Sequence, residues 1–248
     1  MSARSLYRRF AQYYDLLHSD KDYRREVARL VMLIRRFKLS SGRDLLDVAC
    51  GTGRHLSFFK RRFRCVGVDL HPAMLRVARS KVPGVRFVRG DMRSFRLGTR
   101  FDVVTCLYSS ITYVRTVPKL RSTIANFVHH LKPGGVLLIE PYFTPGSFKP
   151  GSHITTRASR GVTITRIAIS RRSGNFASRK SVTVVAAGGG DLALFRETRN
   201  APLFTGQQML SAMRAAGLRA HVLRIQHIGP WGLYVGVKPG IQPPSTVA

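Results

Sequence analysis

The stretch LLDVACGTGRH, residues 45–55, carries the strongest indication of the fold in this chain. An apolar run reaches Asp47 and then enters a turn that contains Gly51 and Gly53. A strand that ends in a glycine-rich turn usually leads into a helix and a ligand, because glycine lets the backbone approach that ligand closely. The stretch therefore predicts the first strand of an α/β sheet with a binding site at its end.

The segments around this stretch alternate between helical and strand patterns. We expect helices at about 4–18, 21–38, 53–61, 72–81 and 117–131, and strands at 45–50, 64–69, 85–89, 101–107 and 136–140. A turn at Lys132-Pro133-Gly134-Gly135 should precede the last of these strands. Strands that alternate with helices of this length predict βαβ units and a parallel sheet.

Residues 145–204 change character. β-branched, alternating segments are separated there by turns of glycine, asparagine and serine, which predicts a small antiparallel β lobe inserted into the α/β fold. A helix at 205–216 and strands at 219–225 and 231–238 should complete the chain. We divide it into an N-terminal helical cover (1–40), a core (41–144 and 205–240) and the inserted lobe (145–204).

The charge of the chain is unusual. It has 248 residues with 42 Lys and Arg against 12 Asp and Glu, a formal net charge of +30. Such a field attracts polyanions, including nucleic acid. The basic residues are scattered from Arg4 to Lys238 without a basic stripe, so a dedicated nucleic-acid surface is not the favoured interpretation. No stretch approaches the roughly 18 apolar residues of a membrane span. Three unpaired cysteines fit a reducing compartment, and we expect a cytoplasmic protein.

The acids that follow the strands narrow the choice of ligand. A dinucleotide site requires a third glycine where this chain has Leu56, and no phosphate-binding P-loop motif is present. Asp47 lies before the glycines, Asp69 ends the second strand and Asp91 follows the third. Asp69 can accept both hydroxyls of a ribose, and Asp91 can accept the amino hydrogens of an adenine. Together they favour S-adenosylmethionine (SAM), although each acid alone could simply be a turn former.

These motifs, with GVDLHPAML, FDVVTCLYSSITYV, LKPGGVLLIEPYF and WGLYVGV, resemble the class I SAM-dependent methyltransferases. Within that class the chain is most similar to the N,N-dimethyltransferases that act on dTDP-amino sugars in macrolide sugar pathways. The resemblance implies a doubly wound, Rossmann-like sheet that is mostly parallel with an antiparallel last strand. It implies that SAM is held by Tyr14, Asp47, Ala49, Gly51, Gly53, Asp69, Leu70, Met74, Asp91, Met92 and Leu107.

The resemblance is less complete on the acceptor side. It implies Tyr7 and Tyr113 as catalytic residues that orient the acceptor nitrogen, although both could instead be aromatic packing under a lid. Tyr113 stands where the family often has a histidine, and a phenol is a poorer base near neutral pH. Tyr142 and Phe143 should line the acceptor pocket, as should Trp231, which stands where the family tends to have an arginine.

We therefore expect an enzyme that transfers a methyl group from SAM to a small-molecule acceptor, at an amino nitrogen, and leaves S-adenosylhomocysteine. No metal is expected. The inserted lobe would form the acceptor site or a homodimer contact. The net charge keeps an RNA or protein methyltransferase open as the alternative, although the position after the fourth strand reads LYSS, without the (D/N)PPY motif of amino-methylating enzymes. A binding protein that lost its activity is a third possibility, which the intact acids and glycines oppose.

Overall fold

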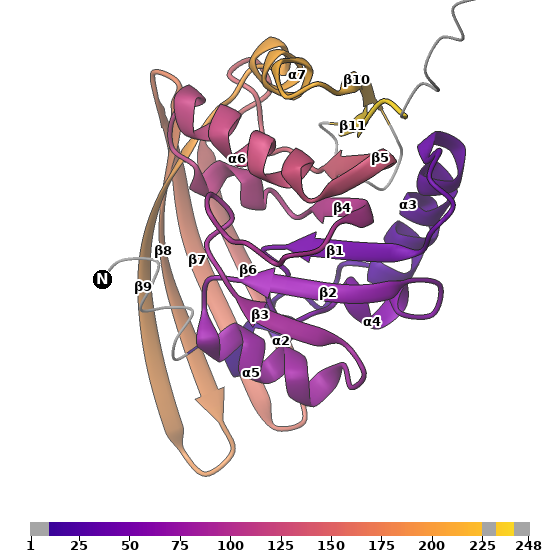
Figure 1. Ribbon diagram of the computed structural model, residues 1–248. Coiled ribbons are helices and arrows are strands. Elements are labelled where there is room, and N and C mark those ends of the chain that lie inside the picture. The colour runs from indigo at the N-terminus through magenta and orange to yellow at the C-terminus, as the bar shows by residue number, and fades with distance from the viewer. Residues whose placement is uncertain (1–9, 225–231, 241–248) are drawn as a thin grey trace, which may run out of the picture.

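The computed structural model describes residues 10–224 and 232–240, which form a seven-stranded and a four-stranded sheet (Figure 1). Tyr7 and Trp231 lie outside the described residues.

The larger sheet has the strand order β10-β11-β5-β4-β1-β2-β3. The pairs β1–β2, β1–β4, β2–β3 and β4–β5 are parallel, whereas β11 runs antiparallel to β5 and to β10. This confirms the expected doubly wound, mostly parallel sheet with an antiparallel last strand. The strands are β1 (Asp44–Val48), β2 (Arg64–Asp69), β3 (Arg86–Arg89), β4 (Phe101–Cys106), β5 (Leu131–Ile139), β10 (Arg219–Leu223) and β11 (Leu233–Val237).

Helices cover both faces of this sheet. Alternate residues of β1, β4 and β5 belong to two separate apolar clusters, as the two-residue period of a strand requires. α6 (Val117–His129) and α7 (Gly206–Ala215) contribute to one cluster. The other contains residues of α3 (Tyr23–Phe37), α4 (Leu56–Phe59) and α5 (Pro72–Lys81). The sheet is therefore buried on both sides, and its carboxyl edge is left to form a site.

The starts of α3, α6 and α7 follow from capping side chains. The carboxylate of Asp22 accepts the N–H of Arg25 at the start of α3, and Thr205 and Gln208 form a reciprocal capping box at the start of α7. Of the first helix expected at 4–18, the described part begins at residue 10 and contains the 3-10 turn η1 (Ala11–Tyr13) followed by the single helical turn α2 (Tyr14–Leu17). The expected turn at 132–135 lies inside β5 as a bulge, and its Gly134 carbonyl accepts the N–H groups of Leu39 and Ser40.

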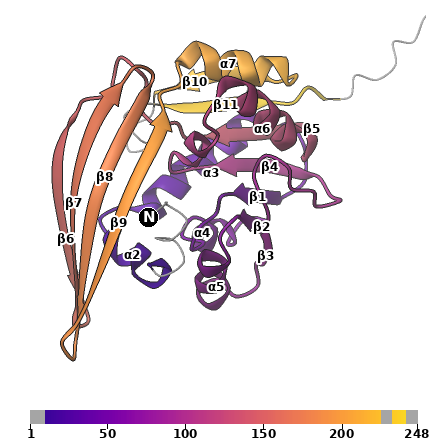
Figure 2. The same cartoon turned by 90° about the vertical axis from the view of Figure 1, so that its left-hand side faces the viewer.

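The smaller sheet confirms the inserted antiparallel lobe. Its order is β6-β7-β8-β9, with β6 (Gly151–Ser159), β7 (Val162–Ser173), β8 (Phe176–Ala187) and β9 (Asp191–Pro202). Figure 2 shows it standing beside the carboxyl edge of the larger sheet, with α2 between the two. We call the face that carries Ile164, Val185 and Glu197 the inner face, since Ile164 and Val185 pack there with Phe10 and Leu17.

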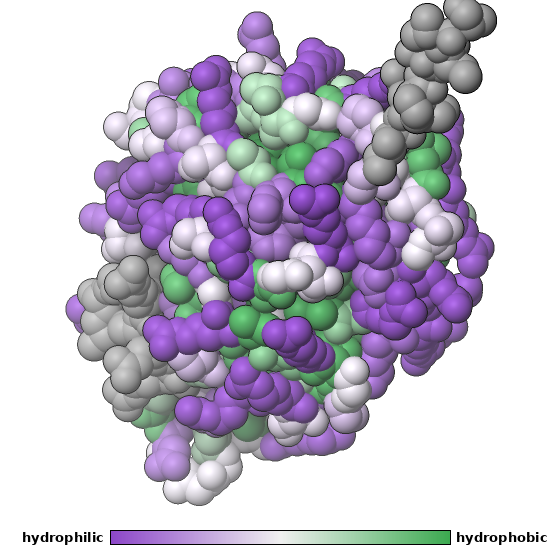
Figure 3. All heavy atoms as spheres, viewed as in Figure 1, coloured by the Kyte–Doolittle hydropathy of each residue, from purple (hydrophilic) through white to green (hydrophobic). Residues whose placement is uncertain are grey.

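Hydrophilic residues are spread over the face of the molecule drawn in Figure 3, and apolar side chains show between them. Among the described residues, no helix combines the length and the apolar character that a membrane span needs.

Candidate active site

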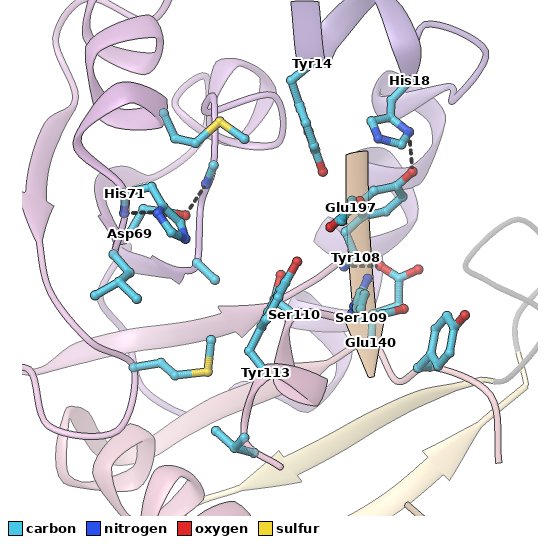
Figure 4. Close-up of a pocket in the computed structure, with 18 of the residues that line it drawn as sticks. Tyr14, His18, Asp69, His71, Tyr108, Ser109, Ser110, Tyr113, Glu140 and Glu197 are labelled. Carbon is cyan, nitrogen blue, oxygen red and sulfur yellow. Dashed lines mark hydrogen bonds between the residues drawn. The ribbon is translucent and has the colours of Figure 1, made fainter. Parts of the chain in front are cut away.

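A cavity of about 780 Å³ lies between the carboxyl ends of the parallel strands and the inner face of the smaller sheet (Figure 4). Residues that follow β1, β2, β3, β4 and β5 form one wall. Thr155, Arg166, Arg179, Glu197 and Arg199, each from a strand of the smaller sheet, form the other. In doubly wound sheets, ligands bind at this edge, where the strand order reverses between β1 and β4.

The turn after β1 brings bare backbone to the cavity. Ala49 and Gly51 have positive φ angles of 58° and 55° and both line the cavity. A Cβ added at Gly51 would meet nothing within 4 Å, so only the missing side chain keeps this part of the wall open. Gly53 does not line the cavity; its φ is +75° and an added Cβ would lie 3.2 Å from Val82. The second glycine therefore serves packing against α5.

Asp69 is fixed by the backbone at the end of β2. One carboxylate oxygen accepts the N–H of Gly51 at 2.9 Å, and the other accepts the N–H of His71 at 2.8 Å. The side chain is buried, which raises the pKa of its carboxyl group, while the backbone N–H groups that it accepts, those of His71 and Gly51 first, act in the opposite direction. A carboxylate can accept more hydrogen bonds than these, and Asp69 lines the cavity.

The remaining residues expected around an adenine also reach the cavity. Leu70, Met74, Asp91 and Met92 all line it. Asp91 also forms a bidentate ion pair with Arg93, whose Nε lies 3.0 Å and 3.1 Å from the two carboxylate oxygens. This ion pair could not be foreseen, because an Asp and an Arg two residues apart in a loop have no fixed geometry.

Asp47 and Leu107 lie behind the cavity wall. Asp47 accepts a hydrogen bond from the Thr105 hydroxyl at 2.7 Å, and burial raises the pKa of its carboxyl group to about 6. Leu107 is buried in the cluster that contains α3. Neither side chain is among those that line the cavity.

The loop after β4 is strained and held in place by an acid. Tyr108 and Ser109 have positive φ angles of 54° and 59°, which cost about 1–2 kcal/mol per residue outside glycine. The carboxylate of Glu140 accepts the N–H of Tyr108 at 2.6 Å, and the hydroxyl of Ser109 donates to the carbonyl of Pro141. This strain sits at the cavity, where strained residues commonly serve a function.

His18 and Tyr108, which lie far apart in the sequence, meet in the cavity wall beside Tyr14. The hydroxyl of Tyr108 lies 2.8 Å from Nδ1 of His18, and the His18 ring lies 4.6 Å from that of Tyr14. Burial, with Arg166 and Arg179 nearby, lowers the pKa of His18 to about 3, so the imidazole is neutral. Burial raises the pKa of Tyr14 well above its usual value, so its phenol stays protonated. The contact between His18 and Tyr108 was not foreseen from the sequence.

Arg199 of β9 joins the two aromatic residues expected near the acceptor. Its guanidinium lies 4.7 Å from the centre of the Tyr113 ring and 5.6 Å from that of Tyr142, within cation–π range. It also donates to the hydroxyl of Thr112 at 2.6 Å. Phe143 lines the same cavity. The structure thus brings Tyr113, Tyr142 and Phe143 to one cavity.

Three charged side chains of the smaller sheet complete the cavity, and sequence reasoning missed all of them. Arg166, Arg179 and Glu197 project from β7, β8 and β9 at positions that share the inner face. Arg179 and Arg199 are direct cross-strand partners, a like-charge pair that destabilises a sheet unless something compensates it. Only the two-residue alternation of the strands could have indicated which of the chain's many arginines face inward.

Comparisons with known proteins agree with this geometry. A family model described as a methyltransferase domain matches residues 45–135. The dTDP-3-amino-3,6-dideoxy-alpha-D-glucopyranose N,N-dimethyltransferase of Streptomyces fradiae is 40% identical over 84% of this chain and 83% of its own length. The crystal structure of Streptomyces venezuelae DesVI has a TM-score of 0.86 at 36% identity, covering 92% of this chain and 98% of that one. A SAM-bound amino pentose methyltransferase of Micromonospora echinaspora has a TM-score of 0.78 at 34% identity, with 89% and 93% covered.

The fold and the acids around its glycine-rich turn define a class I SAM-dependent methyltransferase. Within that class, the chain belongs to the family that contains the dTDP-amino-sugar N,N-dimethyltransferases.

Proposed function

We propose that this enzyme transfers the methyl group of SAM to the amino nitrogen of a sugar carried on a nucleoside diphosphate. The relatives at 36–40% identity are named for dTDP-amino sugars, and a relative with a similar fold was solved with SAM. The observation that carries the proposal is that Asp69 and the arginines of the inner face line one cavity from opposite walls.

The wall of the parallel sheet fits SAM. The Asp69 carboxylate can accept further hydrogen bonds from ribose hydroxyls, and the open backbone at Ala49 and Gly51 leaves room for the methionine end. Asp91 and Met92 would hold the adenine, with Leu70 and Met74 flanking it. Tyr14 would close over the methionine end. SAM supplies a methyl group on a positively charged sulfur. Asp47, Gly53 and Leu107 would act from behind the wall by keeping its backbone in place.

The opposite wall suits an anionic acceptor. No described residue forms a hydrogen bond or ion pair with Arg166 or Arg179, although both line the cavity. Guanidinium groups match the oxygens of a phosphate in pairs, so a diphosphate would satisfy both arginines and relieve their mutual repulsion.

The aromatic residues would then place the sugar. Tyr113, held beneath Arg199, together with Tyr142 and Phe143 would contact the acceptor ring and orient its nitrogen. Tyr7 as a second orienting residue and Trp231 as part of the acceptor pocket remain proposals that fall outside the described residues.

The same arrangement supports the division of the chain proposed from its sequence. Residues 145–204 would serve as the acceptor lobe of a core made of 41–144 and 205–240, under the cover of 1–40. The other role expected for the lobe is a homodimer contact. It would use the outer face of the smaller sheet, opposite the inner face, where Ile154, Ile167 and Leu192 are exposed. Light scattering measures the mass in solution and so tests whether the protein is a dimer. We propose the cytoplasm as the place of action.

A labelled-methyl screen tests the acceptor class. The purified enzyme and labelled SAM are incubated with dTDP-amino sugars, with the matching free amino sugars, and with total RNA. We expect label in the dTDP-amino sugars and little in the free sugars, which lack the diphosphate. Label in RNA alone would contradict the proposal and favour the alternative, for which the net charge of +30 is the supporting observation. Mass spectrometry of the product then counts the methyl groups added.

A further inference from the structure

Glu197 stands out among the charged residues of the cavity. It lies on β9, next but one to Arg199, and its carboxylate points into the space bordered by Tyr14 and Tyr108 (Figure 4). It is partly buried by its surroundings. The mechanism sketched above gives it no role.

Within the described part of this cation-rich chain, the Glu197 carboxylate forms no hydrogen bond or ion pair. Among the residues that the structure describes, every acid except Asp191 and Glu197 forms an ion pair or accepts a hydrogen bond. Asp191 is exposed at the start of β9, where water solvates it. Glu197 faces the cavity instead. Because the chain has 42 Lys and Arg against 12 Asp and Glu, a shortage of cations does not explain why Glu197 forms no ion pair with a described residue.

The cavity carries positive charge at Arg166 and Arg179 and negative charge at Glu197. The negative charge of Glu197 acts to raise the pKa of the Arg166 guanidinium, although the two side chains form no ion pair within the described part of the chain. Arg166 and Arg179 attract an anion, whereas Glu197 attracts a cation that enters the same cavity. An amino sugar carried on a diphosphate has both charges. Its amino group is an ammonium ion near neutral pH, and a partly desolvated carboxylate is the natural partner for it.

We propose that Glu197 is a catalytic residue that binds the acceptor's amino group and stabilises the positive charge that nitrogen gains during methyl transfer. This inference rests on the proposed function. The carboxylate accepts an N–H hydrogen bond from the acceptor amine, which turns the nitrogen lone pair toward the methyl group.

The bonds and charges of the step balance without a further reactant. The neutral amine's lone pair forms the new N–C bond, while the C–S bond breaks and its electron pair stays on sulfur, giving neutral S-adenosylhomocysteine. The positive charge passes from sulfur to nitrogen, next to the carboxylate. The bound ammonium first loses one proton to water, which frees the lone pair that attacks. The extra proton of the methylated product ammonium leaves to water after release. Glu197 thus acts by position and charge and does not need to keep a proton.

The Glu197→Gln variant tests this role, because glutamine keeps the shape and removes the charge. With a dTDP-amino sugar that the wild type methylates, we expect kcat to fall about 100-fold, the size seen when one group aimed at a developing charge is removed. The affinity for SAM, measured by calorimetry, should stay the same. The rise of kcat with pH should also move to lower pH by roughly one unit, because a nearby carboxylate raises the pKa of an ammonium and glutamine does not. A structural role would not move this profile.

Asp191→Asn is the matched control, since it removes the same charge from the same strand outside the cavity. It should leave kcat and the pH profile unchanged. Unchanged kcat in Glu197→Gln, an unshifted profile, or loss of SAM binding in that variant would each overturn the inference. If the wild type methylates no dTDP-amino sugar, the proposed function fails first, which separates the two failures.

Discussion

The two walls of the cavity are built by different means. On the side of the parallel sheet, the site consists of backbone turns with positive φ at Ala49 and Gly51, and of Asp69, whose oxygens are held by backbone N–H groups. On the side of the antiparallel sheet, the backbone is regular and the site consists of charged side chains from alternate positions of β7, β8 and β9.

This difference separates a general half of such an enzyme from a particular half. In the proposed function, turns that need glycine and acids placed at strand ends hold SAM, the donor that all members of the class share, on the wall of the parallel sheet, which we call the donor wall. The inner face of the smaller sheet is then the acceptor wall. Side chains on regular strands can be exchanged without disturbing the backbone, so the acceptor wall can change its ligand while the fold is kept.

The largest effect should come from the donor wall. Asp69→Ala removes a charged acceptor for two ribose hydroxyls, and hydrogen bonds to charged groups contribute about 1.5–3 kcal/mol each. We expect the Kd for SAM to rise about 100-fold or more in a calorimetric titration, with a circular dichroism spectrum like that of the wild type. A Kd for SAM within a few-fold of the wild-type value would show that SAM does not bind at the wall that contains Asp69.

The acceptor wall should respond in the opposite manner. The double variant Arg166→Gln with Arg179→Gln removes two guanidinium groups, and we expect the KM for a dTDP-amino sugar to rise about 30-fold. The Kd for SAM should not change. Arg171→Gln, which lies on the outer face of β7, is the control and should behave like the wild type. A rise in the Kd for SAM in the double variant would place the SAM carboxylate, rather than a diphosphate, on these arginines.

An effect of pH on stability should appear behind the donor wall, at Asp47. Burial holds the pKa of Asp47 at about 6 in the folded state, above the value of about 3.9 expected in the unfolded chain. The folded state therefore binds more protons, and stability falls as pH rises from about 4 to about 6. The asparagine of Asp47→Asn does not titrate. The unfolding free energy of this variant relative to that of the wild type should therefore rise by about 2 kcal/mol between pH 4 and pH 6.

Urea unfolding at several pH values, without SAM, measures this difference. A constant difference between the two proteins would refute it.

The smallest effect separates the two glycines of the opening motif. Gly53→Ala introduces a Cβ 3.2–3.4 Å from Val82, Phe87 and Ala78 at a φ of +75°, and should lower stability by about 1–2 kcal/mol. Gly51→Ala also has a positive φ but meets no atom, so it should be less destabilising and should weaken SAM binding instead. Equal losses of stability and equal SAM binding in the two variants would remove the distinction.

Most of the fold could be predicted from the sequence because it rests on local patterns. β2 and α5 have the expected bounds, since an apolar run that ends at Asp69 and a proline at the first turn of the helix are local signals. The bulge in β5 could not be predicted, because Gly134 takes its conformation from contacts with Leu39 and Ser40, far away in the sequence.

The residues proposed to bind SAM could also be predicted from the sequence, because Gly51 and Asp69 lie in the turns that directly follow β1 and β2. Arg166, Arg179 and Glu197 could not, because on a regular strand nothing local distinguishes a residue that lines a cavity from one that meets solvent. His18 and Tyr108 meet only in the folded state.

In the proposed function, one cavity holds SAM on one wall and a nucleoside diphosphate on the other. Calorimetric titration of dTDP into the enzyme, with and without saturating S-adenosylhomocysteine, measures whether both sites can be filled together. We predict that dTDP binds in both cases, with an affinity that S-adenosylhomocysteine leaves unchanged or improves. Displacement of S-adenosylhomocysteine by dTDP, or no binding of dTDP at all, would refute a cavity with two separate walls.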